Sequence, residues 1–132
     1  MSYYMARRSR QTFDQALLRV QSALADQGFG ILTEIDVQAT LKKKLDVNFH
    51  NYRILGACNP PFAYKALQTE DKIGTMLPCN VVVQQITDEE VEIAAIDPVA
   101  SMQAVENPGL APIAEAVREK LKAAIDRAAE AE

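Results

Sequence analysis

Two runs of mainly apolar, β-branched residues, 81–86 and 91–96, constrain the fold more than any other feature of this chain. Only four polar residues, 87–90, separate them, and so short a connection joins antiparallel neighbours. Residues 29–35 and 52–58 alternate with the period of two that is typical of strands, and residues 3–7 add a short first strand. The pattern therefore predicts a largely antiparallel sheet.

Helical spacing occurs near both ends of the chain. Thr12 and Gln15 form a capping box at the start of a first helix, and Asp36 and Pro61 are suited to begin two shorter helices. Apolar residues recur every three or four positions in the first and last helices: Phe13, Leu17, Val20 and Leu24, then Ile113, Val117, Leu121 and Ile125. We expect an α+β fold with helices packed on one face of the sheet.

Length and composition limit the classes of protein that fit. The 132 residues, 48% of them hydrophobic, predict a single domain over residues 1–132 with an ordered core over about residues 3–127. A net charge of −4 argues against a nucleic-acid partner, because duplex binding requires a basic face. No apolar run approaches the roughly 20 residues that cross a bilayer, so a cytoplasmic protein with reduced thiols is expected.

The two cysteines lie in similar surroundings. Cys58 is followed by Asn59 and two prolines where one apolar run stops, and Cys79 lies between Pro78 and Asn80 where the next begins. Proline ends regular pairing, so each Cys-Asn dipeptide is predicted at a strand terminus. Cys58, Asn59, Cys79 and Asn80 are the candidate binding or thiol site.

Whether these residues meet depends on the connection between the two strands. If the strands are antiparallel neighbours, the end of one lies beside the start of the other and Cys58 approaches Cys79. If the helix after Pro61 instead crosses over to a parallel strand, the thiols lie at opposite ends of the sheet.

A thiol pair could form a reversible disulfide, transfer sulfur through a persulfide, or bind a soft metal ion such as copper(I). None of these uses has its full sequence signature, and His50 is the only histidine available to complete a zinc site. The alternative is that the cysteines are packing residues, since free cysteine behaves as a small hydrophobe.

Glu34 and Asp36 are a second, weaker candidate. They lie two residues apart and so share one face of a strand, where a carboxyl group could act as a general acid or base. Capping of the next helix by Asp36 accounts for that residue more simply.

Three separated segments carry a resemblance to a known family. They are residues 28–41, with Gly28-Phe29-Gly30 and Thr33-Glu34-Ile35-Asp36-Val37; residues 52–60; and residues 77–81. Together they closely resemble the domain-of-unknown-function 302 family. The resemblance implies a compact α+β fold of the TATA-binding-protein-like or helix-grip-like kind, often a homodimer, and it implies no reaction; the sequence identifies no particular cofactor.

The chain departs from the family pattern in one loop. A glycine and an aspartate are expected in place of Asp46 and Asn48, and the glycine would allow a left-handed turn that Asp46 adopts less easily. Many relatives lack one or both cysteines, so a thiol role would belong to a subgroup of the family.

Two functional hypotheses follow. The first is a small binding module, more non-enzymatic than enzymatic, whose two-cysteine site holds a small ligand or soft metal ion in sulfur or redox metabolism. The second is a structural or protein-interaction domain, a homodimer whose cysteines only pack. A hydrophobic small-molecule pocket between the sheet and the last helix is a third possibility.

Overall fold

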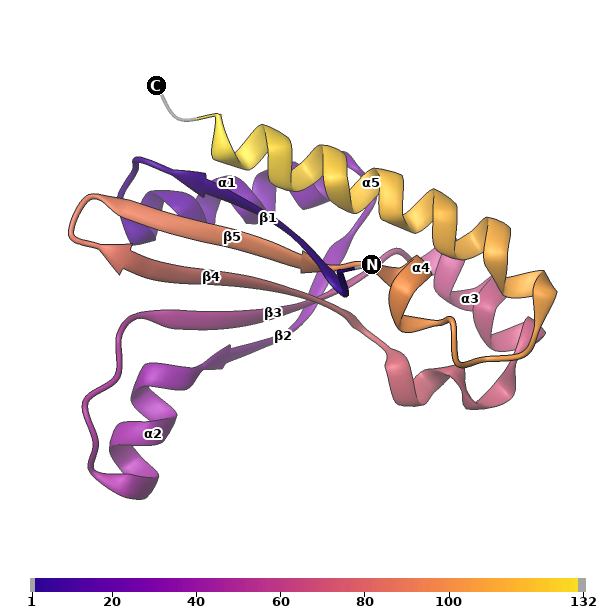
Figure 1. The fold of residues 1–132 in the computed structure, drawn as a ribbon, viewed down its shortest axis with the longest axis horizontal. Coiled ribbons are helices and arrows are strands. Elements are labelled where there is room, and N and C mark those ends of the chain that lie inside the picture. The colour runs from indigo at the N-terminus through magenta and orange to yellow at the C-terminus, as the bar shows by residue number, and fades with distance from the viewer. Residues whose placement is uncertain (1, 131–132) are drawn as a thin grey trace.

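The computed structural model describes residues 2–130 and contains one five-stranded sheet in which every neighbouring pair is antiparallel (Figure 1). The strand order is β1-β5-β4-β3-β2. The strands are β1 (Tyr4–Ser9), β2 (Gly30–Asp36), β3 (Tyr52–Cys58), β4 (Cys79–Thr87) and β5 (Glu90–Ile96). The predicted β4–β5 hairpin and the antiparallel sheet are confirmed.

Two long helices, α1 (Phe13–Asp26) and α5 (Ala111–Ala129), pack on one face of this sheet and on each other (Figure 1). The capping box at the start of α1 is confirmed, because the Gln15 backbone N–H donates to Thr12 Oγ1 at 3.1 Å and the Thr12 N–H donates to Gln15 Oε1 at 3.4 Å. The predicted α+β class is therefore also confirmed.

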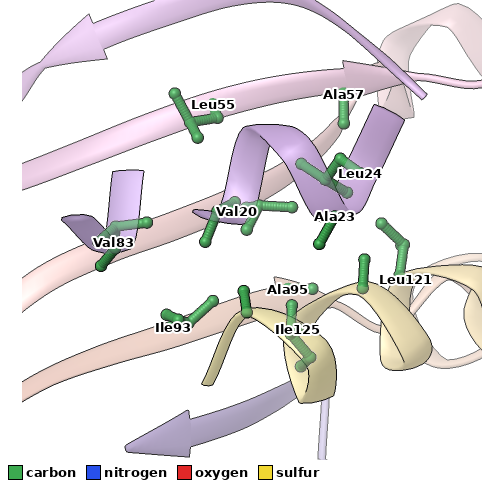
Figure 2. Packing of buried hydrophobic residues seen from close by; sticks show 14 of the residues in the cluster. Val20, Ala23, Leu24, Leu55, Ala57, Val83, Ile93, Ala95, Leu121 and Ile125 are labelled. Atoms are coloured by element: carbon green, nitrogen blue, oxygen red, sulfur yellow. The ribbon is translucent and has the colours of Figure 1, made fainter. Parts of the chain in front are cut away.

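The main core lies between these two helices and the sheet (Figure 2). Leu24 and Leu121 are fully buried there, against alternate residues of the strands. The apolar stripes of the helices and the alternation of the strands supply its largest members, which are Val20, Leu24, Leu55, Val81, Val83, Val91, Ile93, Leu121 and Ile125. Burial of this apolar area is the main stabilising contribution to the fold.

Shorter helical segments lie around one end of the sheet (Figure 1). They are α3 (Pro60–Thr69), the 3₁₀ segments η1 (Asp71–Met76) and η2 (Pro108–Leu110), and α4 (Pro98–Ser101). Buried Ala66, Ile73 and Leu110 form a small second cluster among them. No helix within residues 2–130 combines the length and hydropathy that a membrane crossing requires.

Helix α2 (Val37–Leu45) departs from the expectation that the helices gather on one face. It has no buried residue, and its tertiary contacts are mainly with the adjoining strands β2 and β3. In Figure 1 it projects away from α1 and α5. Asp36 caps it by accepting the Ala39 N–H at 2.9 Å, and Asp46 ends it with φ 54° and ψ 37°, so Asp46 adopts the left-handed conformation that was expected to suit a glycine better.

Candidate functional site: an apolar cavity at the cysteine end of the sheet

The two cysteines lie on neighbouring strands. Cys58 is the last residue of β3 and Cys79 is the first residue of β4. Ala57 is the direct register partner of Cys79, and Cys58 is the partner of Gly30 on the other side. The α3 segment is therefore no crossover to a parallel strand, and the antiparallel arrangement that brings the two thiols to one end of the sheet is confirmed.

Both cysteines line a cavity of about 360 Å³ that is partly open to solvent. Its walls come from the ends of β3 and β4, from α3 and from the start of α5, with α4 and the β2 segment closing the sides. The lining residues are Phe29, Leu32, Ala57, Cys58, Asn59, Phe62, Ala63, Ala66, Leu67, Gly74, Leu77, Pro78, Cys79, Pro98, Met102, Ile113, Ala114 and Val117. The volume is within the range of small-molecule sites.

Small side chains leave this space open. Ala57 on the sheet, Ala63 and Ala66 on α3, and Ala114 on α5 all face the cavity, where larger apolar residues would fill it. Protein interiors are normally packed with few voids larger than a water molecule. At about 30 Å³ per water, this cavity has room for roughly a dozen water-sized groups.

The cavity wall offers almost no polar group. Asn59 is the one lining residue with a polar side chain other than the two thiols, and its Nδ2 donates to the Gln27 carbonyl at 3.1 Å. Asn59 also packs against Gly28, whose φ of +88° is in the left-handed region; a Cβ there would lie 3.2 Å from Asn59 Nδ2. Asn59 therefore fixes the turn between α1 and β2, and the remaining wall suits a ligand with a hydrocarbon body.

The two thiols differ in their surroundings. Cys79 is buried and Cys58 is partly exposed, and both are free. Burial, and secondarily the nearby Cys58, raises the pKa of Cys79 from its ordinary value of 9.0 to about 11. Since the thiolate is the nucleophile and metal ligand, Cys79 is poorly suited to either role at neutral pH.

Asn80 lies apart from the other three predicted residues. It is exposed and contributes to a shallow groove on the opposite, helix-free face of the sheet, together with Tyr52, Val82 and Gln84. Successive residues of a strand point to opposite faces, so Asn80 faces away when Cys79 faces the core. The structure thus brings together Cys58, Asn59 and Cys79 at the cavity and separates Asn80 from them.

Glu34 and Asp36 both lie beside Arg53 of the neighbouring strand. Arg53 makes ion pairs with Glu34 and, at 3.2 Å, with Asp36 Oδ2. Asp36 also caps α2, as expected. Neither carboxyl residue lines the cavity. His50 contacts Gln84 at 3.0 Å, and within residues 2–130 no three potential metal-ligating side chains gather.

Half of the residues that line the cavity lie in helical segments, and none of these was singled out from the sequence as a site residue. Phe62 and Ala63 on α3 and Ile113 on α5 carry no chemical signature. The available signal was limited to single alanines, Ala63 and Ala66 on α3 and Ala114 on α5, at positions where a core helix often carries larger residues.

The fold and the cavity define a small α+β domain with a sheet on one side and an apolar pocket at the end of that sheet. The model of the family described as "Domain of unknown function DUF302" matches residues 5–128, so this chain belongs to that family. The family resemblance seen in the sequence is confirmed over nearly the whole chain.

A solved structure agrees with this assignment. The crystal structure of an uncharacterised conserved DUF302 protein from Bacillus stearothermophilus is 26% identical to this chain and superimposes with a TM-score of 0.90. The match covers 97% of this chain and 99% of that one. Comparison with curated proteins finds no match.

Proposed function

We propose that this protein is a binding module for a small ligand with an apolar body, held in the cavity between the ends of β3 and β4 and the helices α3 and α5. The single observation that supports this function most directly is a cavity of about 360 Å³ whose wall is almost entirely hydrocarbon and sulfur. Filling such a space with a ligand removes apolar surface from water at a gain of about 25 cal/mol per Å².

Equilibrium binding of 1-aminonaphthalene, a neutral and environment-sensitive fluorophore, tests the proposal. Ala63 lines the cavity, and Ala123 is an exposed alanine on the outer side of α5. The variant Ala63→Leu should weaken binding at least tenfold by occupying the space, whereas Ala123→Leu, the matched control, should bind like the parent protein. Equal binding by both variants, or no binding by the parent, would contradict the proposal.

The thiols are assigned to the wall of this pocket. Burial and the high pKa of Cys79 argue against a nucleophilic or metal-binding pair, whereas the position of both cysteines at adjacent strand ends favours one.

Replacing each cysteine with serine distinguishes a role in the pocket wall from a role as a reactive or metal-binding pair. Retention of 1-aminonaphthalene binding by both variants would support a wall role, and stoichiometric copper(I) binding that is lost in both would instead support the two-cysteine site.

The second candidate function is self-association through the helix-free sheet face and the α2 arm (residues 37–50). No residue of α2 is buried, and the side chains of Leu45 and Phe49 in the arm are 66% and 37% exposed. Three lysines and one aspartate give the arm a charge of +2, while the whole chain is at −4, so the remainder is at −6. An acidic body and a basic, apolar arm are complementary, which favours a second copy of the chain as the partner.

Light scattering after size-exclusion chromatography tests this second candidate. Leu45→Asp should convert a dimer to a monomer, and Leu18→Asp, at an equally exposed leucine on the outer side of α1, should leave the dimer intact. A monomeric parent protein would rule out the self-association.

A further inference from the structure

Two lysines converge on one aromatic ring at the cavity. The Lys65 ammonium lies 5.7 Å from the centroid of the Phe62 ring, and the Lys120 ammonium lies 6.0 Å from the same centroid. Phe62 is part of the cavity wall. Lys65 and Phe62 belong to α3 and Lys120 belongs to α5, so the packing of two helices creates this cluster.

Neither lysine has an acidic counterpart. Among the ion pairs of residues 2–130, none involves Lys65 or Lys120, and both ammonium groups lie near the Phe62 ring instead. The positions three and four residues away from each lysine along its helix hold no aspartate or glutamate. Lys43 and Lys44 on α2 also make no ion pair, so what distinguishes Lys65 and Lys120 is their common position beside a ring of the cavity wall.

We infer that the ligand of the cavity is a single-chain amphiphile whose hydrocarbon tail occupies the pocket and whose carboxylate is bound by Lys65 and Lys120. This inference rests on the proposed function and adds the chemical class of the ligand. The apolar wall offers a charged group no partner, so the head group has to remain at a boundary where a cation is available. The Phe62 ring marks that boundary, because it lines the cavity and contacts both ammonium groups.

The size of the cavity sets the length of the tail. Room for roughly a dozen water-sized groups corresponds to a tail of about ten carbons. Decanoate and 1-decanol are therefore suitable probes, because they share the tail and differ in the charge of the head.

Calorimetric titration of both probes at neutral pH is the test. Decanoate should bind at least fivefold more tightly than 1-decanol, and this preference should fall as salt is added, because an exposed ion pair is worth up to about 1 kcal/mol and is screened. The double variant Lys65→Met, Lys120→Met keeps the aliphatic stems over Phe62 and removes the charges. It should bring decanoate binding to the level of 1-decanol without changing the binding of 1-decanol.

Matched controls separate this site from general attraction of anions. Lys43→Met, Lys44→Met removes the same charge from α2, which does not contribute to the cavity, and should keep the preference for decanoate. Acetate, the head group without the tail, should not compete. Ala63→Leu should weaken decanoate and 1-decanol together.

The possible failures are distinct. If 1-decanol and decanoate bind equally in the parent protein and in the lysine variant, the inference is wrong while the apolar-ligand function stands. If decanoate binding survives Ala63→Leu, or is lost equally in the α2 control, the anion is bound elsewhere and the inference is also wrong. If neither probe nor 1-aminonaphthalene binds, both the inference and the proposed function are wrong.

Discussion

The two ends of the helix-covered sheet face are packed in opposite ways. Where α1 and α5 cross the middle of the sheet, large side chains such as Leu24, Leu121 and Ile125 are fully buried and interlock (Figure 2). At the end formed by α3 and the cysteines, alanines occupy equivalent inward positions and a cavity of about 360 Å³ remains. The same helix, α5, takes part in both regions: Leu121 and Ile125 help to fill one, and Ala114 faces the open space of the other.

This contrast indicates that one region mainly stabilises the fold and the other offers space for a ligand. The filled region contains most of the large, fully buried side chains, whereas the open region leaves space that a ligand could occupy. Asn107 and Arg118 strengthen the open region from outside: Asn107 Nδ2 donates to the Thr69 carbonyl at 2.8 Å, and Arg118 Nε donates to the buried Asp97 carboxylate at 3.0 Å. These polar contacts tie α3 and α4 to the segments around α5 while the pocket between them stays open.

The largest effect should come from emptying the filled region. Leu121→Ala is expected to lower the free energy of unfolding by about 3 kcal/mol, because the substitution leaves an unfilled space among fully buried neighbours. Urea denaturation measures the change. The exposed Leu18→Ala should change stability by less than about 0.5 kcal/mol. Comparable losses at both positions would show that the α1–α5 core is looser than described.

Alkaline pH should lower the free energy of unfolding through Cys79, which belongs both to the core and to the cavity wall. Its pKa is raised on folding, so the unfolded chain loses the thiol proton first as pH increases. Stability linked to this thiol is complete below pH 9 and is lost up to about pH 11, by about 2 to 3 kcal/mol in total.

Tyrosines and lysines titrate in the same pH range. The difference in the free energy of unfolding between the parent protein and Cys79→Ala therefore gives the contribution of the Cys79 thiol alone. Urea denaturation at intervals from pH 8 to pH 11 should show the parent curve falling more steeply. Parallel curves for the two proteins would mean that Cys79 titrates as an exposed thiol.

Close packing of β2, β3 and the Pro78 segment beside the cavity can be tested at Gly56. A Cβ at this position would lie 2.1 Å from Thr33 Oγ1 and 2.7 Å from Pro78 Cγ. Gly56→Ala is therefore expected to cost about 1 to 3 kcal/mol through overpacking. Thr33→Ala in the same chain should recover part of that loss in thermal unfolding, and the absence of any recovery would place the strain elsewhere.

The smallest effect on stability should come from the wall of the open region. Met102 lines the cavity and is only partly buried, so Met102→Ala should cost about 1 kcal/mol or less. The enlarged cavity should then favour a longer tail, which a comparison of 1-decanol with 1-dodecanol by calorimetry would detect. A loss as large as that of Leu121→Ala would mean that the two regions are packed alike.

Much of the fold could be predicted from short-range patterns. The β4–β5 hairpin, the Thr12 capping box and the Asp36 cap each depend on a few neighbouring residues, and the structure contains all three. The position of α2 could not be predicted, because its narrow apolar side is the same whether it packs on the sheet or projects from it. The site was predicted in part: the thiols share one end of the sheet, whereas Asn80 lies on its other face.

The sequence by itself determined which segments form strands and helices, because capping, proline geometry and apolar periodicity act between residues close along the chain. It also determined that Cys58 and Cys79 stand at strand termini. Only the tertiary structure decided that alanines of two distant helices leave a common space, and that Lys65 and Lys120, 55 positions apart, meet over one ring. A cavity is what packing leaves unfilled, so no local pattern of residues encodes it.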